Sequence, residues 1–478
     1  MRTERTEVSR PTRHASSDDG ETHYVKSPAA SSRWSRFFRG SLLAMFLIET
    51  ACGSATLKQN DGGATGGKAG AGGAPTGVGG SAGAAGGHAG GGAIGSGGAA
   101  GAGGVGATGG VAGTGGAAGG PPQNTIVAHL YDTCATVGGV AKCWGSNGSG
   151  RGRGSSLGVG QSYSQTPYSA VPLTLSSLGT NVAALSIGPD SYHACALANG
   201  GVMCWGDNSS GQLGDGTTAA SDAPLQVVGI TSGATAVATG DSHSCALVNG
   251  QVLCWGDNSM GQLGVSGSPT TIVTVPLTGT AQAIALGAFH SCALVSVAVW
   301  CWGSNSNGQL GSSSDAGTSG VVQVAGPGAT VQAIAAGGAH TCAIANGGLF
   351  CWGQNNVGQL GDGTMMDRSA PVAVESLSIR VQAVTAGVVD TCAIVNGGAW
   401  CWGSNGAGQV GDNSTNDRWT PTAVQGLGIG VQAITAGGGQ ACALLSGGSV
   451  NCWGGNSDGE LGNNSTTSSP VPVAVQGL

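Results

Sequence analysis

The segment Ser191-Tyr-His-Ala-Cys-Ala-Leu-Ala-Asn-Gly-Gly-Val-Met-Cys-Trp-Gly-Asp-Asn-Ser-Ser-Gly-Gln-Leu-Gly214 places short apolar runs on both sides of Asn199-Gly200. Asn-Gly favours a type I′ turn, because this turn needs a positive φ at both central positions. The turn predicts a β-hairpin in which the two cysteines face each other on a non-hydrogen-bonded pair, where the Cα atoms are closer. That separation suits a disulfide. The predicted register pairs Ala198 with Gly201, Leu197 with Val202, Ala196 with Met203, Cys195 with Cys204, Ala194 with Trp205 and His193 with Gly206.

The tryptophan of this segment recurs along the chain at a nearly constant spacing. Its copies are Trp144, Trp205, Trp255, Trp302, Trp352, Trp402 and Trp453, in steps of 61, 50, 47, 50, 50 and 51 residues. A period near 50 indicates a repeat architecture, and units this small must stack on their neighbours to bury a core. The repeats lie near 124–180, 181–231, 232–279, 280–329, 330–378, 379–428 and 429–478.

Each repeat contains four strand-like segments. They are a Val-Gln-Ala-Ile type run such as Val331–Gly337, the two arms of the hairpin, and an Ala-Pro-Val-Ala-Val type run such as Ala370–Val374. Four-stranded repeats arranged radially form a β-propeller. We therefore predict that residues 124–478 are an all-β, seven-bladed β-propeller of four-stranded blades.

Three of the hairpin turns differ from the Asn-Gly pattern. Gly138-Gly139 in the first repeat serves as well. Ser296-Val297 lacks a residue that favours positive φ, so this turn is expected to be strained or longer. In the last repeat, Ser446-Gly447-Gly448 adds one residue, and a three-residue turn keeps Cys442 opposite Cys452.

Fourteen of the fifteen cysteines form one pair in each repeat. The pairs are Cys134 with Cys143, Cys195 with Cys204, Cys245 with Cys254, Cys292 with Cys301, Cys342 with Cys351, Cys392 with Cys401, and Cys442 with Cys452. Their spacing does not match that of zinc sites. The alternative to disulfides is seven pairs of buried free thiols in a cytosolic protein. We favour disulfides, which imply an oxidising compartment.

The first 123 residues have a different composition from the repeats. A basic segment with Arg33, Arg36 and Arg39 precedes the short apolar run 41–48, which is too short to span a bilayer. The arrangement is typical of an export signal, and Thr50-Ala-Cys52 resembles a bacterial lipoprotein signal with a lipidated Cys52. Residues 1–51 are therefore interpreted as the signal region. A plain secretion signal is the alternative, because Glu49 departs from the lipoprotein pattern.

Residues 52–123 are interpreted as the lipidated cysteine followed by a disordered Gly/Ala-rich linker. Half of residues 61–120 are glycine, 30 of 60, and such a segment cannot bury enough apolar surface to fold. The linker would hold the propeller away from a membrane. The predicted location is the cell surface or the outer membrane, or otherwise the medium.

The charge balance excludes nucleic acid as a partner. Residues 52–478 contain 8 Lys and Arg against 17 Asp and Glu, a net charge of −9. A domain of this sign repels DNA and RNA phosphates.

The repeat consensus, His-Ser/Thr-Cys-Ala-Leu followed by Cys-Trp-Gly-x-Asn-x-x-Gly-Gln-Leu-Gly, resembles that of the regulator of chromosome condensation family. The match is close at Asp241–Gly264, Phe289–Gly311 and Ala339–Gly361, and it extends over essentially all of 124–478. The resemblance implies a seven-bladed propeller. It also implies guanine nucleotide exchange and chromatin binding as the family's founding activity, but those functions depend on loops outside the consensus.

Several residue patterns have both a functional and a structural explanation. His193, His243, His290 and His340 share one repeat position, but the equivalents Asp132, Asp390 and Gln440 favour structural hydrogen bonds over a metal ring. The Asp207-Asn and Asp257-Asn loops fail the calcium-loop spacing and are interpreted as turn chemistry. No catalytic residue, metal site or cofactor is predicted. The residues proposed for ligand contact are Arg151, Arg153, Arg418 and Trp419.

The favoured hypothesis is a surface-tethered, monomeric binding module that recognises a protein or polysaccharide through loops on one rim. One alternative is a propeller enzyme, a lyase or glycoside hydrolase, which an acidic pair at one channel mouth would favour. A guanine nucleotide exchange regulator is a third possibility, by family analogy alone.

Overall fold

The computed structural model of the chain describes residues 124–148, 154–267, 271–312, 318–326, 330–378 and 380–478. These residues form seven antiparallel sheets of four strands, and within each sheet the strands follow one another in chain order. A 3-10 turn, η1 (Ser176–Leu178), joins the first two sheets. The expected all-β, seven-bladed propeller is confirmed.

Each sheet is one blade, numbered here in chain order. Blade 1 contains β1 (Thr125–Ala128), β2 (Asp132–Val137), β3 (Val140–Ser146) and β4 (Tyr168–Thr174). Blade 2 contains β5 (Val182–Ile187), β6 (His193–Ala198), β7 (Gly201–Gly206) and β8 (Ser221–Gln226). Blade 3 contains β9 (Ala234–Thr239), β10 (His243–Val248), β11 (Gln251–Gly256) and β12 (Val273–Thr274). Blade 4 contains β13 (Ala281–Leu286), β14 (His290–Val295), β15 (Ala298–Gly303) and β16 (Thr318–Gln323).

The remaining three blades follow the same pattern. Blade 5 contains β17 (Val331–Ala336), β18 (His340–Ala345), β19 (Gly348–Gly353) and β20 (Arg368–Ala373). Blade 6 contains β21 (Val381–Ala386), β22 (Asp390–Val395), β23 (Gly398–Gly403) and β24 (Arg418–Ala423). Blade 7 contains β25 (Val431–Ala436), β26 (Gln440–Leu445), β27 (Val450–Gly454) and β28 (Ser469–Ala474).

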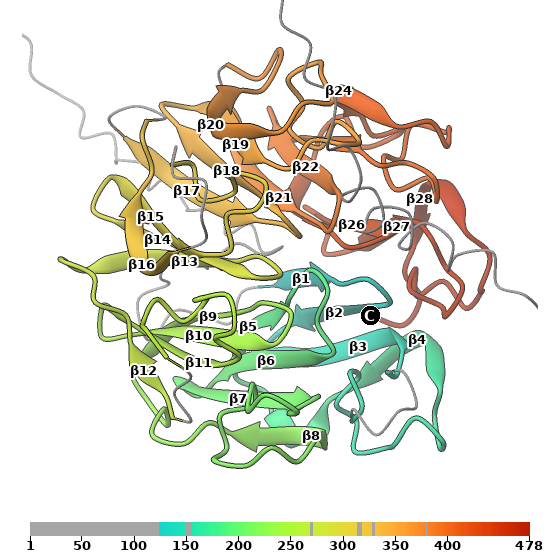
Figure 1. The fold of residues 1–478 in the computed structure, drawn as a ribbon. Coiled ribbons are helices and arrows are strands. Elements are labelled where there is room, and N and C mark those ends of the chain that lie inside the picture. Colours follow the sequence, from blue (N-terminus) through green and yellow to red (C-terminus); the bar gives the residue numbers. More distant parts are fainter. Residues whose placement is uncertain (1–123, 149–153, 268–270, 313–317, 327–329, 379) are drawn as a thin grey trace, which may run out of the picture. The chain divides into compact units, whose positions relative to one another are not determined.

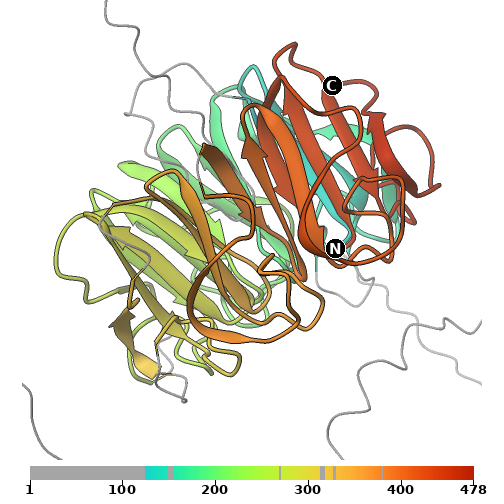
Figure 2. The same cartoon turned by 90° about the horizontal axis from the view of Figure 1, so that it is seen from above.

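The first strand of every blade packs against the first strands of both neighbouring blades. The ring closes where β1 packs against β25 and β26, so the first blade (teal) lies beside the last (red) in both Figure 1 and Figure 2. Because every sheet is built from consecutive strands, no shared sheet joins the two ends of the ring. The seam between blades 7 and 1 therefore depends on packing and hydrogen bonds.

The central hairpins have the register expected from their turns. In blade 2 all six predicted pairs are present, from Ala198 with Gly201 to His193 with Gly206, and Asn199 and Gly200 both have positive φ. The expected three-residue turn of blade 7 is also present, with Cys442 opposite Cys452. The turn at Ser296-Val297 is not longer, because Val295 pairs with Ala298, but Ser296 carries the strained φ of 58°.

All seven cysteine pairs expected from the sequence are disulfides, with Cα atoms 4.0–4.1 Å apart. Each one joins the two central strands of its own blade, and all fourteen cysteines are fully buried. In chain order the bonds join Cys134 to Cys143, Cys195 to Cys204, Cys245 to Cys254, Cys292 to Cys301, Cys342 to Cys351, Cys392 to Cys401, and Cys442 to Cys452. The disulfides therefore clamp the hairpins individually, while contacts between blades have another origin.

The repeat tryptophans provide those contacts. The indole Nε1 of Trp402 donates a 3.0 Å hydrogen bond to the backbone carbonyl of Gln359, which lies in the Gly-Gln-Leu-Gly segment of the preceding blade. The glycine that ends this segment, Gly361, lies so close to the ring that a Cβ would be 2.6 Å from Nε1 of Trp402. The same hydrogen bond occurs at every junction, from Trp144, Trp205, Trp255, Trp302, Trp352, Trp402 and Trp453 to Glu460, Ser156, Gln212, Gln262, Gln309, Gln359 and Gln409 respectively.

The antiparallel order gives the propeller two different faces. The loops from first to second strands and from third to fourth strands emerge on one face, here called the long-loop face. The hairpin turns lie on the opposite face, here called the turn face.

Candidate functional site: the seam between blades 7, 1 and 2

Four buried histidines link successive blades. Nε2 of His290 lies 2.9 Å from the hydroxyl of Thr341 in the next blade, and this hydroxyl donates to the carbonyl of Gln309. Since the hydroxyl proton is already used, Nε2 must carry the imidazole proton. The equivalent pairs are His193 with Ser244, His243 with Ser291 and His340 with Thr391. These hydrogen bonds agree with the structural role expected for the histidines.

Protonation of these imidazoles is strongly disfavoured. Burial lowers the pKa of His193, His243 and His290 to about 3 and that of His340 to about 4. In His243, His290 and His340 the second nitrogen, Nδ1, is buried without a hydrogen-bond partner among the described residues. The junctions from blade 2 to blade 6 therefore require neutral imidazoles.

At two other junctions the histidine and the hydroxyl residue of the next blade are both replaced. Where the next blade has alanine in place of the hydroxyl residue, at Ala194 and Ala441, the histidine is replaced by Asp132 and Asp390. Both carboxyl oxygens of Asp390 are buried without partners among the described residues. Burial raises the pKa of Asp390 well above its usual value, so this carboxyl is stabilised in its neutral form.

Blade 1 also departs from the repeat at the end of its first strand. Six blades have glycine there, and a Cβ on each of these glycines would lie within 2.7 Å of a carbonyl oxygen of the next blade: Gly188, Gly240, Gly287, Gly337, Gly387 and Gly437. Blade 1 has His129 instead. Its Nδ1 lies 2.8 Å from Oδ1 of Asp132, and both side chains are buried.

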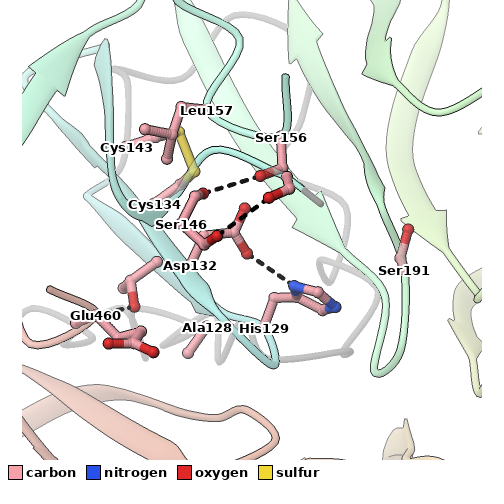
Figure 3. A network of polar contacts seen from close by, with 12 residues as sticks. Ala128, His129, Asp132, Cys134, Cys143, Ser146, Ser156, Leu157, Ser191 and Glu460 are labelled. Carbon is pink, nitrogen blue, oxygen red and sulfur yellow. Dashed lines mark hydrogen bonds and ion pairs between the residues drawn. A yellow bond between two sulfur atoms is a disulfide. The ribbon is translucent and has the colours of Figure 1, made fainter. Parts of the chain in front are cut away.

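This histidine and aspartate leave two polar atoms unsatisfied. A carboxylate only accepts hydrogen bonds, so Nδ1 of His129 donates to Asp132. Nε2 of His129 and Oδ2 of Asp132 are buried without partners among the described residues. In the view of Figure 3, the pair lies between Glu460 on one side and the loop of Ser191 on the other.

Blade 7 contributes a third departure on the other side of the seam. Five blades have glutamine at the third-to-fourth strand loop, but blade 7 has Glu460, whose backbone carbonyl accepts hydrogen bonds from Trp144 and Thr133 of blade 1. Its carboxylate accepts the backbone N–H of Asp458 at 2.8 Å, as the glutamine side chains accept the corresponding N–H. Burial raises the pKa of Glu460 to about 7, with Asp458 contributing.

Blade 2 contributes a longer loop. Between the first-strand glycine, Gly188, and His193 it has four residues, whereas blade 3 has two between Gly240 and His243. The longer loop carries Asp190. Partial desolvation raises the pKa of Asp190, and the positive charge that His129 can carry opposes this.

Together these departures form one group of side chains, here called the seam cluster: Tyr131, Asp190, Tyr192, Asp458 and Glu460. Burial raises the pKa of Tyr131, and the other four members of the cluster raise it further. Among the described residues the ion pairs are His129–Asp132, Arg368–Asp362 and Arg418–Asp412, and none of them involves Asp190, Asp458 or Glu460. The cluster is a negatively charged, aromatic region at the ring closure.

The residues expected from the sequence to contact a ligand are not part of the seam cluster. Arg418 pairs with Asp412 inside its own loop, with Nε 2.6 Å from Oδ2, so its charge is already engaged. Trp419 is 45% exposed and lies over Gly358 of the preceding blade. Arg151, Arg153 and Cys52 lie outside the described residues.

The Asp-Asn loops have the turn chemistry expected for them. Oδ1 of Asn208 accepts the N–H of Leu213 at 2.9 Å, and its Nδ2 donates to the carbonyl of Ala219. Asp207 accepts the N–H of Ser209. In the part of the chain that the structure describes, no group of three or more His, Cys, Asp or Glu is arranged to hold a metal ion.

Exposed aromatic side chains are concentrated toward the long-loop face. Tyr131, Tyr163 and Phe289 lie in its loops, while Tyr168 and Trp419 lie at or beside the ends of outer strands that these loops enter. Exposed methionines lie in the same loops, at positions 260, 365 and 366. Aromatic residues and methionine are enriched at protein interfaces, so this face is the better candidate for ligand contact.

The sequence interpretation did not identify the seam cluster. The signal was present in the aligned repeats, where Glu460 stands against five glutamines and His129 against six glycines. Glu460 lies 316 positions from Trp144 and 327 from Thr133, and only closure of the ring brings them together.

Comparisons with known proteins agree with this architecture. The family model of the RCC1-like domain matches residues 140–478. The chain is similar in fold to human WBSCR16, with 23% identity, a TM-score of 0.60, and coverage of 66% of this chain and 86% of that one.

It is also similar to yeast RCC1 (Prp20) in its structure bound to Kap60. There the identity is 20%, the TM-score is 0.60, and 73% of this chain and 86% of that chain are covered. A structure of Prp20p from Saccharomyces cerevisiae, described with its binding properties to Gsp1p and histones, gives 20% identity and a TM-score of 0.59 over the same shares. In the described residues, no helix has the length and apolar character needed to cross a membrane.

Proposed function

Because the chain belongs to the RCC1-like domain family, whose seven-bladed propeller is a general binding and scaffold architecture, we propose that it binds a protein through its long-loop face. The observation that carries this proposal is the gathering of exposed aromatic and methionine side chains toward that face. Yeast RCC1 (Prp20) has been solved bound to Kap60 and described with its binding properties to Gsp1p and histones, which supports a protein as the class of ligand.

Two other functions have less support. The enzyme alternative needs an accessible acidic pair, and Asp458 and Glu460 are neighbours with raised pKa values. Glu460 is only 3% exposed, and its carboxylate accepts a hydrogen bond from the backbone N–H of Asp458 in its own loop. It is therefore poorly placed to reach a substrate. Nucleotide exchange continues to depend on family analogy alone.

The binding proposal is tested by comparing matched surface variants of the full chain. Trp419→Ser and Met366→Ser remove side chains that are 45% and 64% exposed on the rim of the long-loop face. Ile429→Ser removes a side chain that is 83% exposed. It lies in the connection from β24 to β25, on the turn face. We expect chemical crosslinking on the cell envelope to retain a protein with the wild type and with Ile429→Ser, and to lose it with the other two.

Thermal melting of each variant excludes unfolding as the cause of a loss. A partner that is retained equally by all three variants, or lost only with Ile429→Ser, would show that the long-loop face is not the binding surface.

We further propose that the propeller lies outside the cytoplasm, anchored at the cell surface through a lipidated Cys52. The support is the set of seven disulfides, because such bonds persist in oxidising compartments and are rare in the cytosol. Fractionation is expected to recover the protein with the membrane envelope, and alkylation without reductant is expected to leave the fourteen propeller cysteines unmodified. Recovery of fourteen reactive thiols from cytosolic material would contradict the proposal.

A further inference from the structure

An asparagine that precedes glycine can be attacked by its own backbone. The glycine nitrogen bonds to Cγ of the asparagine, the Cγ–Nδ2 bond breaks, and ammonia leaves with the proton of the glycine N–H. Water then opens the resulting succinimide ring to aspartate or isoaspartate, so water is the only other reactant. Glycine permits this attack because it has no Cβ to obstruct the approach.

The chain contains seven Asn-Gly dipeptides, and all of them lie in described residues. They begin at Asn147, Asn199, Asn249, Asn307, Asn346, Asn396 and Asn405. Three lie in loops of the long-loop face, and four are the hairpin turns of blades 2, 3, 5 and 6. Because the seven pairs are chemically identical, their surroundings decide which of them react.

The three dipeptides of the long-loop face are held in unreactive arrangements. In Asn147 and Asn405, which are fully buried, Nδ2 donates to backbone carbonyls and Oδ1 accepts a backbone N–H. After Asn307, the N–H of Gly308 donates to the carbonyl of Asn305 at 3.1 Å. Each reaction would therefore first have to break these hydrogen bonds.

The four turn asparagines are exposed, and they have the same backbone conformation, with φ of 51–53°. They differ in the hydrogen bonding of the glycine that follows. The N–H of Gly347 donates to Oε1 of Gln332 at 3.0 Å, and the N–H of Gly397 donates to Oε1 of Gln382 at 2.6 Å. In blades 5 and 6 the attacking nitrogen is therefore capped by a glutamine side chain.

Blades 2 and 3 lack this cap because of their first strands. The two glutamines occupy the bulged residue of the first strand, and the equivalent residues are Ala183 and Thr235. Alanine has no acceptor, and the shorter side chain of Thr235 donates to the carbonyl of Leu247 at 3.3 Å. The N–H groups of Gly200 and Gly250 consequently have no hydrogen-bond acceptor among the described residues.

The cap opposes the reaction because the glycine nitrogen must lose its proton and turn toward Cγ. Breaking one neutral hydrogen bond slows a reaction about fivefold. In blade 2 a second contact favours the attack, since Nδ2 of Asn181 donates to Oδ1 of Asn199 at 3.0 Å. This is the oxygen that gains negative charge as the ring closes, and a donor stabilises that charge.

From these contacts we propose that Asn199 and Asn249 are sites of spontaneous deamidation, and that the glutamine caps protect the turns of blades 5 and 6. Each event adds one negative charge to the turn face. The disulfide between Cys195 and Cys204 holds the blade 2 hairpin together when isoaspartate lengthens its turn. The inference is independent of the proposed binding function, which is assigned to the opposite face.

The test incubates the purified full chain at mildly alkaline pH, digests it with an acid protease, and follows each Asn-Gly peptide by mass spectrometry. We expect Asn199 and Asn249 to convert about fivefold faster than Asn346 and Asn396. The three dipeptides of the long-loop face are expected to convert more slowly than any turn.

Variants of the cap provide matched controls within one molecule. Gln332→Leu should accelerate conversion of Asn346 about fivefold and leave Asn396 unchanged. Gln332→Glu keeps an acceptor and should leave Asn346 slow. Ala183→Gln supplies the missing cap in blade 2 and should slow conversion of Asn199.

Each outcome has a defined meaning. Equal rates in all four turns, or an unchanged rate at Asn346 in Gln332→Leu, would overturn the role of the cap. Acceleration of Asn396 in the same variant would indicate general unfolding, which would also overturn it. If no turn converted, or if Asn307 converted faster than Asn199, the assignment of the sites would be wrong.

Discussion

The contribution of four buried histidines to the free energy of unfolding is expected to fall steeply as pH is lowered from about 6.5 toward 4. The four histidines that link the blades have a usual pKa of 6.5, and burial lowers it to about 3 or 4 in the folded state. Below pH 6.5 the unfolded chain therefore binds protons that the folded chain does not, so stability is fully present above this pH and is lost beneath it. The loss is on the order of 1 kcal/mol per pH unit for each histidine. Urea unfolding at pH 7, 5.5 and 4.5 measures it.

A single variant attributes the effect to the histidines. His290→Gln places at this position the residue that blade 7 has at Gln440, so the fold is expected to survive. With this histidine removed, the slope of the free energy of unfolding against pH between 6.5 and 4.5 should fall by about 1 kcal/mol per pH unit. Aspartates with lowered pKa values, such as Asp362 and Asp412, act only below about pH 4. Asp390 and Glu460, whose pKa values burial raises, oppose the histidines in this range, but they do so equally in both proteins and cancel from the comparison. Equal slopes in the two proteins would contradict this account.

Gly361→Ala is expected to destabilise the propeller by about 2–5 kcal/mol. Gly361 has a φ of +69°, which costs an alanine about 1–2 kcal/mol. The added methyl would also lie 2.6 Å from Nε1 of Trp402, the atom that hydrogen-bonds Gln359, and such overpacking costs about 1–3 kcal/mol more. The midpoint of urea unfolding at pH 7.5 gives the change.

Gly216→Ala is the matched control for this variant. Gly216 has a similar φ of +82°, but a methyl there would meet no atom within 4 Å. Its cost should therefore be limited to the backbone strain, about 1–2 kcal/mol. If both variants lost the same free energy of unfolding, the close packing of Gly361 on the indole of Trp402 would not contribute to the contact between blades.

Much of the fold could be predicted because its determinants are neighbours in the sequence. Asn199-Gly200 sets the turn, and the turn sets the register that brings Cys195 opposite Cys204. The Ser296-Val297 turn shows where local reasoning was incomplete. The strands that flank it enforce a two-residue connection, and Ser296 accepts the strain although its side chain does not favour positive φ.

The candidate site depended much more on tertiary structure. Arg418 was expected to contact a ligand, but it pairs with Asp412 six residues earlier, a partner that the sequence does not distinguish from other nearby acids. Trp419 is exposed as a contact residue would be, yet its environment over Gly358 comes from another blade. Sequence spacing alone does not reveal which side chains have free charge.

The sequence by itself determined the number of blades, the hairpin register and the disulfide pairing, since turn chemistry and alternation of side chains act over a few residues. Only the tertiary structure decided that Tyr131, Asp190 and Glu460 share one region. The physical reason is ring closure. The first and last blades must pack against each other, and this contact joins residues whose separation along the chain exceeds 300 positions.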